Sequence, residues 1–206
     1  MIILFATAGS GNCFKAQLLM RQLEIAHHTV MVDVIGGETR KPAFLRINPN
    51  GTVPFLLLED GRGIAESNAI LWYLAKGSHL FPQSTFEEAM AVQWMIFEQT
   101  KLESNISPAR FFTTIVPERR EGMEDRILAW QSAGRQGLTR LDAHLRFQDF
   151  VAGPRYSIAD IAVYGYTHVA GEGGFDLDAY PAVSAWIDRI KAITGYVAMP
   201  DLAQAA

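Results

Sequence analysis

The residue types best suited to chemistry near the start of the chain stand in the segment Ser10-Gly-Asn-Cys13. It lies between an apolar run over residues 2–6, which predicts a buried strand, and a helical pattern over 12–25. Two cysteines spaced in this way at the start of a helix perform dithiol exchange. Here serine replaces the first, and the chain has 1 cysteine in all. We therefore expect the segment to hold the thiolate of another molecule.

Ser10 has the chemistry that stabilises a thiolate. Lowering a thiol pKa by about two units from roughly 8.5 requires about 2.7 kcal/mol. A hydroxyl hydrogen bond to a charged acceptor contributes about 1.5–3 kcal/mol, and a helix N-terminus adds about 0.3–1 kcal/mol. Ser10 also suits a helix cap, and Asn12 is either a second donor or a turn residue. Cys13 is expected inside the fold, as inert packing or as a redox thiol.

Two later segments offer groups for a peptide-like ligand. Val53 precedes Pro54 at the start of an apolar strand, and a cis bond there would turn the Val53 backbone towards an extended ligand. Glu66 and Ser67 follow a strand at a helix start, where Ser67 offers donors to a carboxylate and Glu66 accepts from an ammonium. The alternative for Ser67 is a simple N-cap. Together with Ser10, these groups match the thiol, the peptide backbone and the γ-glutamyl end of glutathione.

The order of elements over residues 1–76 explains how these segments meet. Strand patterns at 2–6 and 29–34 flank the first helix, which predicts a parallel pair. A strand at 54–58, a turn, a strand at 63–65 and a helix at 66–75 follow. This β-α-β, β-β-α order is that of a thioredoxin-like domain, with the three segments at one sheet edge.

The rest of the chain has a different pattern. Residues 77–85 are rich in turn formers and predict a linker. From 86 to 206 we expect an all-helical domain, with helices near 86–112, 123–147, 157–169 and 182–193. Pro108 should end or kink the first of them. Glu98, Glu103 and Arg110 are expected on a salt-bridged surface or on an interface face. The fold class is thus α+β with two domains.

Composition excludes several functions. The formal net charge is −4 and no block of Lys and Arg occurs, which disfavours nucleic acid as a partner. No apolar run approaches the roughly 18 residues of a membrane span, and no signal peptide is recognisable. One cysteine and no clustered histidines predict no metal site. We expect a cytoplasmic protein without nucleic-acid or membrane partners.

These residues resemble the glutathione transferase family over most of the chain. The stretch KPAFLRINPNGTVPFLLLEDGRGIAESNAILWYLA is similar to its N-terminal domain, and SGNCFK resembles its bacterial, serine-containing groups. The resemblance implies that Ser10 activates the thiol, with Asn12 as second candidate. It implies that Val53 and Pro54 meet the cysteinyl backbone and that Glu66 and Ser67 hold the γ-glutamyl group. Arg40 or Lys41 would reach the glycyl carboxylate, or be ordinary surface residues.

The same resemblance implies the reaction and the partners. Glutathione would be the co-substrate, a small apolar electrophile the second substrate, and detoxification the role, in a homodimer without metal. Two alternatives stay open: a glutathione-dependent peroxidase or disulfide reductase, which would use Cys13, and a non-enzymatic binding protein. In the second half, GPRYSIADIAVYGY resembles the family's capping segment. There Ser157 and Asp160 have the S-x-x-D spacing of a capping box, which serves folding.

Overall fold

The computed structural model describes residues 1–199 of the chain. Its contacts divide the chain into two compact units. Of the described residues, the first comprises 1–78 together with 194–199, and the second comprises 79–193. The sequence analysis instead placed 77–85 in a linker and everything after 85 in the helical domain. Each unit has the predicted class, a thioredoxin-like sheet domain and an all-helical domain.

The first unit is built on a four-stranded sheet in the order β2-β1-β3-β4. Its strands are β1 (Ile2–Ala6), β2 (His27–Met31), β3 (Phe55–Leu57) and β4 (Gly63–Ala65). β1 and β2 run parallel, as predicted, and β1 pairs with β3 and β3 with β4 in antiparallel fashion. The predicted strand at 2–6 has the bounds of β1, because a short apolar run between turn residues fits a buried strand closely.

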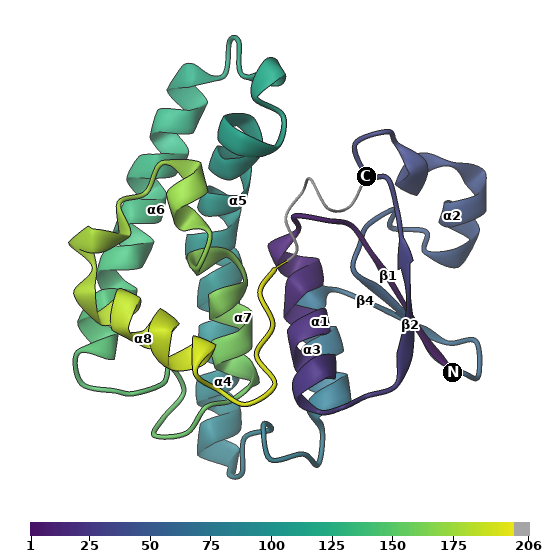
Figure 1. The fold of residues 1–206 in the computed structure, drawn as a ribbon, viewed down its shortest axis with the longest axis horizontal. Helices are drawn as coiled ribbons and strands as arrows, with labels where there is room; N and C mark the ends of the chain where they lie inside the picture. The colour runs from purple at the N-terminus through teal and green to yellow at the C-terminus, as the bar shows by residue number, and fades with distance from the viewer. Residues whose placement is uncertain (200–206) are drawn as a thin grey trace. The chain divides into compact units, whose positions relative to one another are not determined.

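Helices cover both faces of this sheet (Figure 1). On one face, α1 (Gly11–Gln22) and α3 (Ser67–Ala75) lie side by side and pack on the strands. Their shared core contains side chains from both helices and from β1 and β3, namely Leu4, Ala6, Cys13, Ala16, Met20, Leu56 and Ile70. The other face carries a smaller cluster of Phe5, Val32, Phe44 and Phe55.

The segment between β2 and β3 holds two short helices that the sequence analysis described only as a polar connection. These are η1 (Glu38–Arg40) and α2 (Pro42–Ile47). Pro42 stands at the first position of α2, where its missing N–H costs nothing. Phe44 is the one buried residue of that helix, and its ring meets Phe5 edge-on at 5.9 Å. One apolar anchor in six residues gives no detectable periodicity.

The second unit is helical. Its longer helices are α4 (Thr85–Phe97), α5 (Ser104–Arg110), α6 (Glu124–Leu145), α7 (Ile158–Thr167) and α8 (Pro181–Lys191). Short segments connect them, namely η2 (Glu98–Glu103), η3 (Phe111–Ile115), η4 (Pro117–Arg119), η5 (Ala170–Gly173) and η6 (Leu177–Ala179). All 10 residues of α7 are buried, which makes it the central helix of this unit.

The helix does not end at Pro108, which was one of the two outcomes predicted for it. Pro108 lies inside α5, and the chain stays helical through two π-helical turns, η2 before it and η3 after it. Proline removes one backbone donor, and a π-helical turn accommodates such a break in the bonding pattern. Glu98 and Arg110 are buried, so the expectation that they belong to a salt-bridged surface was wrong.

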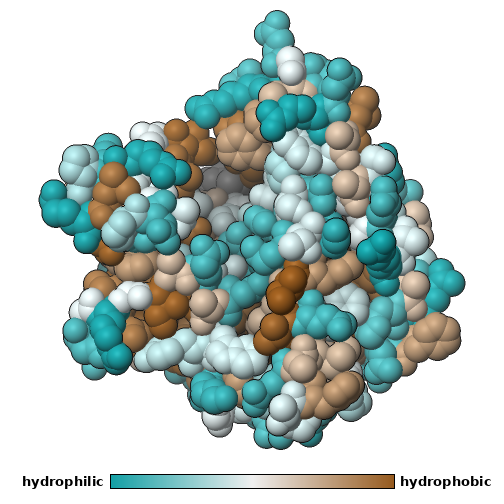
Figure 2. All heavy atoms as spheres, turned by 180° about the vertical axis from the view of Figure 1, so that it is seen from behind, coloured by the Kyte–Doolittle hydropathy of each residue, from teal (hydrophilic) through white to brown (hydrophobic). Residues whose placement is uncertain are grey.

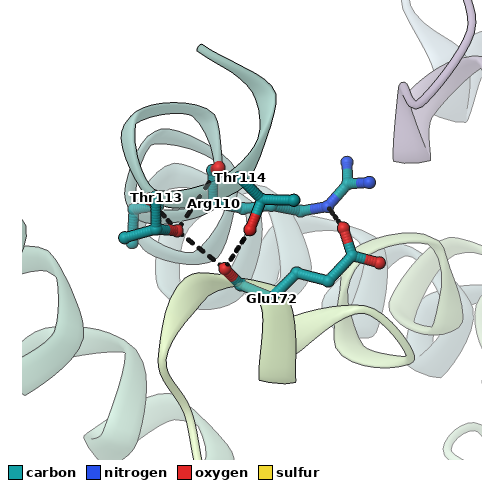
Figure 3. A network of polar contacts seen from close by, with 5 residues as sticks. Arg110, Thr113, Thr114 and Glu172 are labelled. Atoms are coloured by element: carbon teal, nitrogen blue, oxygen red, sulfur yellow. Dashed lines mark hydrogen bonds and ion pairs between the residues drawn. The ribbon is translucent and has the colours of Figure 1, made fainter. Parts of the chain in front are cut away.

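Arg110 instead helps to fasten η3 to η5, as Figure 3 shows. Its Nε donates to the Glu172 carboxylate at 2.7 Å. The Thr113 and Thr114 hydroxyls both donate to the carbonyl oxygen of Glu172, each at 2.7 Å. One side chain at the end of α5 and two from η3 therefore hold a single residue of η5.

The predicted capping box of α7 is present and forms part of a larger buried network. Ser157 caps the helix, and the Asp160 carboxylate accepts the Ser157 N–H at 3.0 Å. The same carboxylate accepts the Val151 N–H at 2.9 Å and the Trp186 indole N–H at 3.0 Å. One fully buried acid therefore joins α7, the loop before it and α8.

In residues 1–199 each helix is too short or too polar to cross a bilayer. Within the same range, groups of three or more His, Cys, Asp or Glu suited to a metal ion do not occur. On the face shown in Figure 2, hydrophobic side chains are interspersed with hydrophilic ones.

The Asp160 network generates a stability prediction. We expect Asp160→Ala to lower the free energy of unfolding by about 3 kcal/mol, because it leaves buried donors unpaired. Burial raises the pKa of Asp160 from 3.8 to about 6. The folded state therefore binds this proton more tightly, and the added stability is complete below pH 3.8 and lost as the pH rises through about 6.

Urea unfolding of wild type, Asp160→Ala and Asp160→Asn across this pH range measures both effects. The stability of wild type relative to Asp160→Asn, which cannot titrate, should fall by on the order of 2 kcal/mol between pH 4 and 7. If the difference in free energy of unfolding between wild type and Asp160→Asn does not change with pH, the predicted titration of Asp160 is wrong. If Asp160→Ala is as stable as wild type, the predicted contribution of the network is wrong.

Candidate functional site

Ser10 occupies the N-cap of α1. Its backbone is extended (φ −84°, ψ 116°), and its Oγ accepts the Cys13 N–H at 3.2 Å. A hydrogen bond with the Ser10 side chain also lowers the pKa of the Cys13 thiol. The structure thus directs the Ser10 hydroxyl towards Cys13, in the capping role that the sequence allowed. A hydroxyl has one donor and two acceptor positions, so capping itself leaves its proton able to rotate to another acceptor.

Cys13 is fully buried in the core between α1 and the sheet. Its Sγ accepts the Thr7 N–H at 3.4 Å. Burial raises the pKa of the thiol to about 11, although the bonds from Ser10 and Thr7 act in the opposite direction. Because the thiolate is the reactive form, a thiol with this pKa is a poor nucleophile at neutral pH.

Asn12, in the first turn of α1, lies at a junction of three side chains. Its Oδ1 accepts from Lys15 Nζ at 2.8 Å and from Ser67 Oγ at 3.1 Å. Asn12 and Ser67 are 55 residues apart in sequence, and the structure brings these two predicted site residues into direct contact. Lys15 was not singled out in the sequence analysis. Its spacing of three residues from Asn12, one helical turn, is the signal that could have identified it.

Val53 and Pro54 form a cis peptide bond directly before β3. The pairing of β3 begins at Phe55, so Val53 lies outside the ladder. The buried Asn48 supports this loop: its Nδ2 donates to the Thr52 carbonyl at 2.8 Å, and its Oδ1 accepts the Asn50 N–H at 3.1 Å. The sequence analysis missed Asn48, because a loop asparagine has many other uses.

Glu66 and Ser67 mark the junction of β4 and α3. Glu66 is exposed and has a positive φ of 70°, a conformation that is rare and costly for a residue with a side chain. Ser67 is buried and is the first residue of α3, so its backbone N–H lies at the helix N-terminus. Strained residues of this kind often occur at ligand sites. A positive φ at glutamate has no signature in a single sequence.

Arg40 and Lys41 are both exposed, at the junction of η1 and α2. The Arg40 guanidinium reaches the Asn50 carbonyl with a long contact of 3.5 Å, which places it at the loop that carries Val53. Lys41 is the N-cap residue of α2 and makes no side-chain capping bond. Of the two, Arg40 has the closer structural link to the other predicted residues.

The arrangement favours binding an anion over making one from the chain's own thiol. The first turn of α1 presents Asn12 and the partial positive charge of a helix N-terminus. The N-terminus of α3 presents a second set of donors, joined to the first through the bond between Ser67 and Asn12. Two neighbouring helix N-termini suit a ligand that carries two separate negative groups.

Comparisons with known proteins match most of the chain to one family. Two family models match the chain, the glutathione S-transferase N-terminal domain over residues 9–76 and the C-terminal domain over residues 117–189. A solved glutathione S-transferase from Pseudomonas fluorescens Pf-5 is 39% identical, with a TM-score of 0.93 and coverage of 97% of this chain and 99% of that chain. Another, from Xanthobacter autotrophicus Py2, is 32% identical, with a TM-score of 0.94 and coverage of 99% of both chains.

A curated relative has a different activity in its name. The disulfide-bond oxidoreductase YfcG of Escherichia coli K12 is 29% identical over 191 residues, which is 89% of this chain and 87% of that protein.

The burial of Cys13 generates a prediction about its reactivity. With the pKa of its thiol raised to about 11, Cys13 carries about 100-fold less thiolate than an ordinary cysteine at neutral pH. We expect alkylation by iodoacetamide to be at least 100-fold slower in the native protein than in urea. Because the chain has 1 cysteine, mass spectrometry of the intact protein measures the rate directly. Equal rates in the two states would show an accessible, activated thiol.

Proposed function

The chain belongs to the glutathione S-transferase family, and we propose that it binds glutathione in its first unit and activates the glutathione thiol for attack on a small apolar electrophile. The observation that carries this proposal is the side-chain junction at Asn12. It joins the N-termini of α1 and α3, the two elements that would meet the sulfur and the γ-glutamyl carboxylate.

The parts of glutathione distribute over the predicted residues as follows. The γ-glutamyl carboxylate meets the Ser67 N–H at the start of α3, and the γ-glutamyl ammonium meets Glu66. The backbone of Val53, outside the ladder of β3 and next to Pro54, pairs with the cysteinyl residue. Arg40, with Lys41 beside it, attracts the glycyl carboxylate.

The sulfur is held as an anion at the first turn of α1. Asn12 is the principal donor to it in this proposal, because the Ser10 hydroxyl accepts the Cys13 N–H and its own proton is taken by the hydrogen bond that lowers the pKa of the Cys13 thiol. Ser10 contributes as the cap that orders the turn. Donation by Asn12 and the helix N-terminus together supply the roughly 2–3 kcal/mol that lower the thiol pKa by about two units.

The chemistry then needs no metal and no covalent enzyme intermediate. The thiol releases its proton to solvent, and the thiolate forms a bond to the electrophilic carbon while the leaving group departs with its electron pair. Family membership extends the proposal to a homodimer that acts in the cytoplasm, with detoxification as its role.

A second candidate is glutathione-dependent disulfide reduction, which the similarity to the Escherichia coli oxidoreductase favours. The glutathione thiolate attacks one sulfur of a disulfide and the other sulfur leaves as a thiolate. This reaction uses the same activated sulfur and no thiol of the chain. Cys13→Ala therefore separates it from a mechanism that uses the enzyme's cysteine, because activity that survives the change must come from glutathione itself.

The binding step is tested by calorimetry with glutathione. We expect a dissociation constant below about 1 mM and a loss of about tenfold in affinity for Glu66→Ala, since it removes an ionic contact. Glu59→Ala, which changes an exposed glutamate at the far end of the hairpin between β3 and β4, is the matched control and should bind as wild type does. Absence of binding at millimolar glutathione would favour a non-enzymatic role.

The activation step is tested by kinetics with 1-chloro-2,4-dinitrobenzene as a probe electrophile. We expect Asn12→Ala to lower kcat by about 10- to 100-fold, because it removes a donor to the sulfur anion. Ser10→Ala should have a smaller effect, and Cys13→Ala almost none. A kcat that falls only in Cys13→Ala would overturn the proposal in favour of an enzyme thiol.

A further inference from the structure

Lys15 is a fully buried lysine near the start of α1, with 0% of its surface exposed. Lysines are almost never fully buried unless they are paired, because removing an ammonium group from water costs several kcal/mol. The other buried positions of α1 carry small or apolar side chains such as Phe14 and Ala16, so Lys15 is the one charged residue among them. A buried ammonium group needs polar partners, and Asn12 is one of them.

The contact that Lys15 makes determines the orientation of the Asn12 amide. Its Nζ lies 2.8 Å from Asn12 Oδ1. An ammonium group has donors and no acceptor, so the branch of the amide that faces it must be the oxygen. Ser67 Oγ donates to the same oxygen from α3 at 3.1 Å. Because an ammonium group cannot accept a hydrogen bond, the contact with Lys15 excludes the flipped amide, and Nδ2 occupies the other branch of the Asn12 amide.

We propose that Lys15 is a positioning residue for thiol activation: its buried ammonium group holds Asn12 with the amide nitrogen directed at the sulfur of bound glutathione. This inference rests on the proposed function and adds to it the residue that sets the orientation and polarity of the donor. A cation on the carbonyl oxygen also polarises the amide, which strengthens donation by its N–H groups.

The junction also links the two ends of the ligand site. Ser67 lies where the γ-glutamyl carboxylate binds in the proposal, and its hydroxyl shares the Asn12 oxygen with Lys15. A ligand carboxylate that draws the Ser67 hydroxyl to itself leaves Lys15 to keep the amide in place. Lys15 is therefore needed most when the site is occupied.

The test is a titration of the thiol of bound glutathione, followed by thiolate absorbance in the ultraviolet. In Lys15→Met we expect the pKa of the bound thiol to rise by about one unit and kcat/KM at neutral pH to fall about tenfold. Binding of S-methylglutathione, which has no thiol proton, should change less than about twofold. Lys191→Met, which removes an exposed lysine of α8, is the control for loss of charge and should match wild type in every measurement.

Two further variants separate this role from a structural one. Lys15→Gln keeps a hydrogen-bond donor for Asn12 but removes the charge. If orientation and charge both contribute, the pKa of the bound thiol in this variant should lie between those of wild type and Lys15→Met. The same variant replaces Lys15→Met in the test if Lys15→Met does not fold. In the Asn12→Ala background, Lys15→Gln should have almost no further effect, because Lys15 acts through Asn12.

The outcomes are distinct. If wild type itself leaves the glutathione thiol with its solution pKa, the proposed function fails and the inference falls with it. If wild type lowers that pKa and the Lys15 variants lower it equally, the inference alone is overturned. It is also overturned if the Lys15 variants weaken binding of S-methylglutathione as much as binding of glutathione. The same holds if the effects of the Lys15 and Asn12 substitutions on the thiol pKa are additive.

Discussion

The packing of α1 against the sheet is the constraint on which the site depends. Cys13, Ala16 and Met20 lie on one side of the helix and pack with Leu4 and Ala6 of β1. This face fixes the rotation of the helix about its axis, and hence the direction of every side chain in its first turn. Asn12, one residue before Cys13, is therefore turned about 100° away from the core, towards the start of α3.

The same burial decides which thiol can react. A sulfur anion is favoured by a helix N-terminus and disfavoured by an apolar core. Cys13 lies at the helix start, but its Sγ is inside the core, and the pKa of its thiol rises to about 11. A ligand sulfur at the outer side of the same turn would be stabilised by the helix N-terminus without the cost of burial in an apolar core. The fold therefore keeps the chain's own sulfur in the core and leaves the outer side of the turn to a ligand.

Much of this arrangement could be predicted from sequence, because it follows from local patterns. The alternation of short apolar runs with one helical stripe predicts β1, α1 and the parallel β2, and the turn before Gly63 predicts the antiparallel hairpin. Asn12 and Ser67 could be assigned to one region, since the strand order brings the starts of α1 and α3 together.

What could not be predicted depends on single residues in an environment that only the folded chain supplies. The burial of Lys15 and the positive φ of Glu66 leave no periodic trace in the sequence. The helix α2 is anchored by Phe44 alone, and the helicity around Pro108 is maintained by π-helical turns that depend on contacts elsewhere in the second unit. The rule that proline breaks helices describes the hydrogen bond lost at Pro108 and takes no account of the π-helical turns on either side of it.

Two buried charges show how folding and function differ in this chain. Asp160 and Lys15 are each fully buried near the start of a helix. Asp160 accepts from backbone and indole donors that have no other task, so its partners explain its presence completely as part of the fold. Lys15 donates to Asn12, a half-buried polar side chain at the start of the same helix. In the proposal made above, this contact orients the donor that meets the ligand sulfur, so the charge of Lys15 would serve the site.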